Sequence, residues 1–180
     1  MASIKGFQLK NVKQTLGIEG YGCIASMYLH GKKIGTYADY GDGGCEDVDY
    51  VSKEAEAEMM KVIIEYAKEH PNKYIVDLYH ERPQQFNEEC ERFKKYHPYI
   101  PDKDITIETM ASNSIVYIVE GVLELMEHEK YFKKYQKQGY KAISLEGSRL
   151  HAYPMALSDE KIKASAKGHE LYMSLDDFNK

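Results

Sequence analysis

The 180-residue sequence has no tryptophan and only three cysteines, Cys23, Cys45 and Cys90, which share no C-x-x-C spacing. This odd number and spacing argue against a disulfide framework or a thiolate zinc site, and they favour a reducing compartment. The opening MASIKGFQLK lacks the apolar core of a signal peptide, and no apolar run approaches the length of a membrane span. These absences predict a cytoplasmic protein that does not enter a membrane.

The charge balance also excludes two function classes. The formal net charge is −5, which is too mild for a DNA mimic and has the wrong sign for a uniformly basic nucleic-acid binder. Any contact with nucleic acid therefore depends on a local patch of cations. The length and the 43% hydrophobic content suit one well-buried core, so we expect a single domain over residues 1–180.

The apolar pattern alternates between period two and a helical period. We expect a strand over residues 4–12, hairpins over 22–40 and 140–154, helices over 52–69, from Pro83 and over 114–138, a short helix after Ser158 and a strand within 169–175. Residues 74–79 fit either a strand or a buried helical turn. This order predicts an α+β domain, in which helices pack on an antiparallel sheet built from hairpins.

The turn of the first hairpin sets its expected register. A two-residue turn at His30-Gly31 places Met27 opposite Ile34 on the core side of the sheet. The same register places Tyr28 and Tyr37 on the other side.

An acidic loop follows this hairpin, with the sequence GDGGCEDVDY over residues 41–50. Asp42, Glu46 and Asp47 offer oxygen ligands for one Mg²⁺ ion, but their spacing matches neither an EF-hand nor a phosphate-binding P-loop. The alternative is a solvated connection into a helix that Ser52 caps, because helix starts favour acidic residues. We favour the connecting loop and expect neither a metal nor a cofactor.

Lysines and aromatic residues alternate at the end of the long helix. Lysines can neutralise phosphates, and aromatic rings can stack on unpaired bases, so the segment is a candidate RNA- or partner-binding surface. The alternative is a helix whose aromatics face the core and whose lysines complement its negative C-terminus. The candidate residues are Lys130, Lys133, Lys134, Tyr135, Lys137, Tyr140 and Lys141.

The second hairpin carries the candidate catalytic group. With a turn at Gly147-Ser148, one face carries the polar residues and the opposite face is apolar. A base, an acid and a cation are what metal-free cleavage of an RNA strand requires, and histidine can serve as either base or acid. The alternative is a cross-strand Glu–Arg pair beside an incidental histidine. The candidate catalytic residues are Glu146, Arg149, His151 and Tyr153.

Three segments also resemble small proteins carried on mobile elements of Gram-positive bacteria. They are SIKGFQLKNVKQTLGIEGYG, MYLHGKKIGTYADYGDGG and YQKQGYKAISLEGS. Within that group the chain resembles the type II anti-CRISPR proteins that cause truncation of a guide RNA. The likeness rests on these segments and on no short catalytic signature.

The resemblance implies a type II CRISPR effector nuclease and its guide RNA as partners, inside a bacterial host cell. Three functions remain open on the sequence. The protein inhibits the effector by causing guide-RNA cleavage, it inhibits the effector by occluding a groove, or it is a small ribonuclease unrelated to CRISPR. Engagement of a very basic effector suits the mild acidity of the chain.

Overall fold

The computed structural model describes residues 1–70, 77, 79–96, 105–106 and 115–180. It contains a four-stranded and a three-stranded antiparallel sheet together with helices, so the predicted α+β class is confirmed. The chain divides into two compact units, Lys10–Val119 and Met1–Leu9 with Glu120–Lys180. The expectation of one domain over residues 1–180 stays a prediction.

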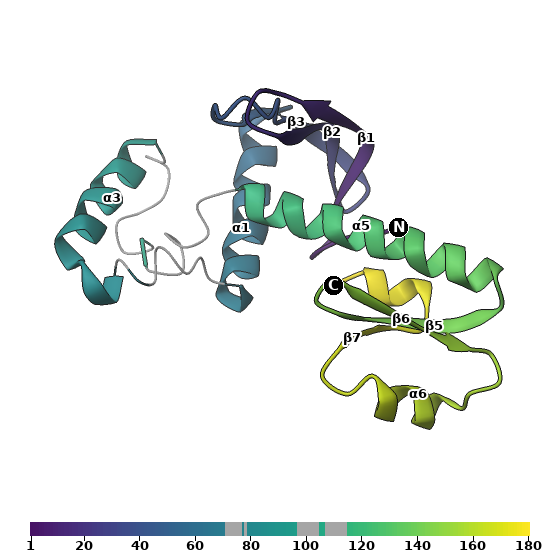
Figure 1. Ribbon diagram of the computed structural model, residues 1–180. Coiled ribbons are helices and arrows are strands. Elements are labelled where there is room, and N and C mark those ends of the chain that lie inside the picture. Colours follow the sequence, from purple (N-terminus) through teal and green to yellow (C-terminus); the bar gives the residue numbers. More distant parts are fainter. Residues whose placement is uncertain (71–76, 78, 97–104, 107–114) are drawn as a thin grey trace. The chain divides into compact units, whose positions relative to one another are not determined.

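The Lys10–Val119 unit contains the four-stranded sheet, whose strand order is β1-β2-β3-β4 (Figure 1). Helix α1 lies beside β3 and β4 and buries one apolar stripe that includes Met59 and Ile63. The elements are β1 (Phe7–Leu16), β2 (Tyr21–Leu29), β3 (Lys32–Ala38), β4 (Asp47–Tyr50), α1 (Lys53–Glu69) and α3 (Pro83–Tyr96).

The starts of both helices follow the sequence signals. The Ser52 hydroxyl caps α1 by accepting a hydrogen bond of 3.2 Å from the backbone N–H of Ala55, as predicted. Helix α3 begins at Pro83 and buries Phe86 and Phe93, again as predicted. Of the ambiguous stretch 74–79, residues 74–76 and 78 lie outside the described residues, and Asp77 and Tyr79 are helical.

The register of the β2–β3 hairpin differs from the expected one. Near the turn the pairs are as expected, but a β-bulge follows, and Met27 pairs with Gly35 instead of Ile34. The bulge adds one residue to β3, which rotates the rest of that strand by one position. Tyr37 consequently pairs with Ala25 and is buried, so its expected place on the other side is wrong. Tyr28 is half-buried beneath the Lys10 ammonium, 4.1 Å from its ring centre.

Strand β4 was not expected from the sequence. Asp47–Tyr50 pairs with β3 along the sheet edge, with Asp47 and Asp49 exposed and Val48 and Tyr50 half-buried. Alternating burial is typical of a strand, but a strand of this length is difficult to distinguish from a loop in the sequence. None of the helices in the described part of the chain has the length and apolar composition needed to span a bilayer.

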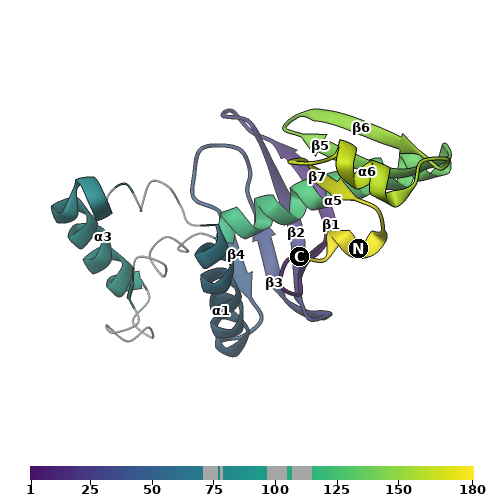
Figure 2. The same ribbon diagram turned by 90° about the horizontal axis from the view of Figure 1, so that it is seen from below.

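The second unit contains the three-stranded sheet, with β5 at its centre. In Figure 1 the sheet lies between α5 and α6, and Figure 2 agrees because α6 there lies in front of the sheet. The predicted helix, hairpin, short helix and last strand are all present. The elements are α5 (Ile115–Lys137), β5 (Tyr140–Glu146), β6 (Arg149–Pro154), α6 (Asp159–Ser165), β7 (Glu170–Tyr172) and the 3₁₀ helix η2 (Leu175–Phe178).

The two faces of this sheet have separate cores. On one face Tyr172 stacks on Phe178, with ring centres 4.5 Å apart, and Phe178 contacts Phe132 of α5 at 5.6 Å. On the other face Ala142 and Tyr153 pack with residues of α6, including Ile162. Strand β5 is therefore covered on both sides.

A buried carboxylate joins α5 to the start of the chain within this unit. Glu129 is 6% exposed, and it accepts hydrogen bonds from the Ala2 backbone N–H at 3.1 Å and the Lys133 ammonium at 2.7 Å. Burial raises the pKa of Glu129, but these donors outweigh burial and bring it below its ordinary value. The resulting stabilisation is present above the ordinary pKa of 4.5 and is lost as the pH falls through the lower folded-state value.

We expect Gly35→Ala to destabilise the Lys10–Val119 unit by about 1–3 kcal/mol or more. A Cβ atom at this position would lie 2.4 Å from the Asp49 carbonyl oxygen and 3.1 Å from Tyr50 Cα, both of which are backbone atoms. Gly44→Ala is the matched control, since its nearest neighbour is the flexible Asp42 side chain at 3.2 Å. Urea unfolding of both variants measures the difference. Equal midpoints for the two would contradict this account of the bulge.

Candidate functional site

The β5–β6 hairpin has the register that the sequence predicts. The turn at Gly147-Ser148 places Glu146 opposite Arg149, and the pairs alternate faces from there. The polar face holds Ser144, Glu146, Arg149 and His151, with Ala142 and Tyr153 at its far end.

Strand β7 adds a second histidine to this face. It pairs with the opposite edge of β5, with Leu145 opposite Glu170, so His169 is the residue before the paired segment. The rings of His151 and His169 stack with centres 5.4 Å apart and planes 25° from parallel. The two imidazoles thus come from β6 and from the residue just before β7, on either side of β5.

One carboxylate serves both imidazoles. Glu146 Oε2 lies 3.7 Å from His151 Nε2, and Glu146 Oε1 lies 3.8 Å from His169 Nε2. His151 Nε2 is buried and makes no hydrogen bond within the described part of the chain. The Glu146 side chain itself is 56% exposed, so solvent or a ligand can reach the cluster from its side.

The two stacked imidazoles lie beside one carboxylate, so the cluster brings together two groups that can each act as base or acid. A neutral and a protonated imidazole side by side form an acid–base pair for proton transfer. We call Glu146, His151 and His169 the hairpin cluster.

A buried hydrogen-bond chain supports His169. The Ser144 hydroxyl is fully buried and lies 2.9 Å from the Tyr153 hydroxyl and 3.4 Å from His169 Nδ1. Tyr153 is only 8% exposed, because residues of α6 cover it. The predicted catalytic Tyr153 therefore lies beneath the surface and contacts the cluster through Ser144.

Arg149 lies at the exposed end of the same face. Its place opposite Glu146 fits the cross-strand ion pair that the sequence also allowed. Within the described residues, however, the ion pairs of Glu146 are with His151 and His169, and Arg149 makes none. The Arg149 guanidinium is thus available for an anion at the edge of the cluster.

The lysine–aromatic segment divides into engaged and exposed residues. Lys133 pairs with Glu129, and Lys141 pairs with Asp159, which lowers the pKa of the Asp159 carboxyl. Lys130, Lys134 and Lys137 are exposed on α5. Tyr135 and Tyr140 are half-buried and contact each other edge to face, with ring centres 5.5 Å apart.

The acidic loop behaves as a backbone turn. Asp39 Oδ1 accepts from the Gly41 N–H at 2.8 Å, and Asp42 Oδ1 accepts from the Gly44 N–H at 3.2 Å. Among the described residues, Asp42, Glu46 and Asp47 form no group at metal-ligand spacing. Residues 41–46 are thus the connection that was expected, whereas Asp47–Tyr50 forms strand β4.

Sequence reasoning found His151 and missed His169. The hairpin register follows from a local turn, but the pairing of β7 with β5 spans a whole intervening helix. The available signal was the alternation in HELYMSL, which places His169 and Leu171 on one face. Comparison of the chain with known protein families, curated proteins and solved structures finds no match.

We expect Ser144→Ala and Tyr153→Phe to be energetically coupled. Each change leaves the other buried hydroxyl without its 2.9 Å partner, which costs about 1–3 kcal/mol. The double variant should lose less than the sum of the two, with a coupling of about 1 kcal/mol. A double-mutant cycle by urea unfolding measures the coupling. Strictly additive losses would contradict a stabilising hydrogen bond between these two hydroxyls.

Proposed function

We propose that the protein inhibits a type II CRISPR effector nuclease by causing cleavage of its guide RNA in the bacterial cytoplasm. The observation that carries the proposal is the hairpin cluster, in which two imidazoles share one carboxylate beside an exposed guanidinium. The resemblance of three sequence segments to guide-RNA-truncating anti-CRISPR proteins supports the choice of RNA. The effector itself is very basic, which suits a chain with net charge −5.

The proposed reaction is a transesterification within the RNA strand. A neutral imidazole of the cluster takes the 2′-hydroxyl proton, and O2′ forms a bond to the adjacent phosphorus. The protonated imidazole gives its proton to the departing 5′-oxygen as the P–O5′ bond breaks. The products are a 2′,3′-cyclic phosphate and a 5′-hydroxyl, with no net gain or loss of protons or electrons.

The other residues have supporting roles in this proposal. Arg149 stabilises the charged phosphorane with a two-pronged contact. Glu146 lies beside both imidazoles and places a negative charge next to them. Tyr153 and Ser144 are positioning residues, because they reach the cluster only through His169 Nδ1.

The lysine–aromatic segment is the proposed RNA- and partner-binding surface. Its exposed lysines offer cations for phosphates, while Lys133 and Lys141 hold carboxylates of the protein itself. Tyr140 is the first residue of β5, so this surface leads directly into the strand that carries Glu146.

A denaturing gel of guide RNA tests the function. The guide is incubated with the protein, with and without effector, and effector-dependent truncation supports the proposal. An inhibited effector with an intact guide would indicate an occluding inhibitor. Truncation of guide and of unrelated RNA without effector would indicate a general ribonuclease.

We expect His151→Asn, His169→Asn and Glu146→Gln each to reduce the truncation rate by about 100-fold or more, since each removes or misplaces a proton-transfer group. Arg149→Lys should recover only part of the loss seen in Arg149→Ala. The matched control is His30→Asn, a turn residue with a positive φ of 48° that asparagine tolerates. Circular dichroism checks the fold of every variant.

Two further readouts accompany these variants. The truncated guide should carry 2′,3′-cyclic phosphate and 5′-hydroxyl ends, which mass spectrometry identifies. Excess chelator should leave truncation intact, provided that effector loading is completed beforehand. Parent-like truncation by both His151→Asn and His169→Asn would place the chemistry elsewhere.

We expect the paired change Lys134→Ala/Lys137→Ala to weaken the complex with guide RNA, most strongly at low salt. Each lost phosphate contact reduces the slope of log K against log salt by about 0.7 for single-stranded RNA. Lys61→Ala/Lys68→Ala on α1 is the control, since it removes the same charge from exposed positions elsewhere. Filter binding at several salt concentrations gives the slope for the α5 variant and for the α1 control. Identical slopes would mean that the α5 lysines do not contact the phosphates of the RNA.

A further inference from the structure

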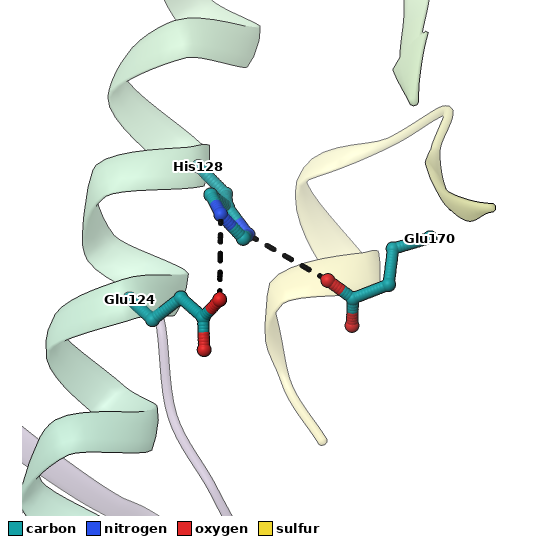
Figure 3. A group of neighbouring side chains, drawn as sticks. All are labelled: Glu124, His128 and Glu170. Atoms are coloured by element: carbon teal, nitrogen blue, oxygen red, sulfur yellow. Dashed lines mark ion pairs between the residues drawn. The ribbon is translucent and has the colours of Figure 1, made fainter. Parts of the chain in front are cut away.

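Figure 3 shows a second histidine cluster, formed by Glu124, His128 and Glu170. Glu170 pairs with Leu145, whose side chain lies on the opposite face of β5 from that of Glu146, so this cluster is on the other face of the sheet. Glu124 and His128 are one turn apart on α5, and Glu170 comes from β7. One donor atom from each residue lies within 4.8 Å of the other two. His128 stands between the two carboxylates, with Nε2 at 3.9 Å from Glu124 and Nδ1 at 3.9 Å from Glu170.

The hydrogen bonds of His128 fix which ring nitrogen is free. The Tyr172 hydroxyl donates to Glu170 Oε2 at 3.3 Å, so its oxygen accepts from His128 Nδ1 at 3.0 Å. In a neutral imidazole this hydrogen bond places the proton on Nδ1, and Nε2 then presents its lone pair toward Glu124.

This is the arrangement of a metal-binding histidine. Such histidines donate their other N–H to a neighbouring acceptor, which fixes the tautomer and the ring orientation. The His128 side chain is only 9% exposed, and within the described residues its Nε2 makes no hydrogen bond. A nearly buried imidazole thus directs Nε2 at an exposed carboxylate 3.9 Å away.

The two carboxylates suit the same role. The Lys180 ammonium holds Glu170 Oε1 at 2.7 Å, while Oε2 accepts from the Tyr172 hydroxyl and lies 3.9 Å from His128 Nδ1. The Glu124 side chain is 68% exposed and can shorten its 3.9 Å separation from Nε2 by rotation.

We propose that Glu124, His128 and Glu170 bind one divalent transition-metal ion of the Zn²⁺ type. One imidazole nitrogen and two carboxylate oxygens are ligands that Zn²⁺ accepts, with water in the fourth position. The nitrogen donor disfavours Mg²⁺ and Ca²⁺, because both prefer oxygen ligands.

The proposed ion has a structural role that is separate from the hairpin cluster. It cross-links α5 to β7, two elements that are distant in sequence and that both contact the central core of this unit. Metal binding at such a site adds to folding stability, because the unfolded chain does not present the three ligands together. The hairpin cluster lies on the other face of β5 and needs no metal for proton transfer.

Titration with ZnCl₂ tests the proposal on tag-free protein that has been stripped with chelator and dialysed. Isothermal calorimetry should give one site per chain, and the melting temperature should rise with added Zn²⁺. Glu124→Gln should weaken Zn²⁺ binding by at least about 10-fold and abolish the rise in melting temperature. Glu120→Gln, an exposed change of the same charge on the same helix, should behave as the parent.

A second pair of variants separates the two histidine clusters. Zn²⁺ affinity and stoichiometry should be unchanged in His151→Asn/His169→Asn, because these residues lie on the other face of the sheet. Parent-like binding by Glu124→Gln, or loss of the site in the His151/His169 variant, would overturn the proposal. Absence of Zn²⁺ binding to the folded parent protein would overturn it as well.

Discussion

The central position of β5 is the constraint on which the second unit depends. This strand pairs with β6 on one edge and β7 on the other, and both of its faces are covered. Ala142, Ile143 and Ser144, three consecutive residues, are all at most 1% exposed. Because consecutive side chains alternate faces, one short segment fixes both cores at once.

Alternation also explains why the register of this strand matters for chemistry. A slip by one residue would exchange the faces of β5, placing Glu146 against α5 and Ile143 on the polar side. The fully buried Ile143 opposes such a slip through its apolar burial, and Ser144 opposes it through its hydrogen bond to Tyr153. The packing that stabilises the unit therefore also determines where the catalytic candidates lie.

Local signals carried the parts of the fold that the sequence predicted correctly. The Ser52 cap and the Gly147-Ser148 turn act over a few residues, so their outcomes follow from local chemistry. The bulge at Met27–Gly35 did not follow, because it depends on a close approach of the Asp49 backbone from a strand that pairs later in the chain. His169 and Glu170 reach their partners only through the long-range pairing of β7.

The burial of two polar side chains on α5 was not predicted from the sequence, for a different reason. Helical periodicity assigns apolar residues to the core, yet His128 and Glu129 are 7% and 6% exposed. Their burial is compensated by partners that are far along the chain, Tyr172 for His128 and Ala2 for Glu129. No spacing rule within a helix can indicate such partners.

The two histidine clusters differ in the partner of Nδ1, and this difference separates their chemistry. The Tyr172 hydroxyl donates its hydrogen bond to Glu170, so its oxygen accepts from His128 Nδ1, and Nε2 of a neutral ring is then an acceptor, which suits a metal ligand. Ser144 can donate or accept, so His169 Nδ1 accommodates either proton position, which suits proton transfer. The two clusters thus lie on opposite faces of the three-stranded sheet, and the hydrogen-bond partner of Nδ1 restricts the tautomer of His128 but not that of His169.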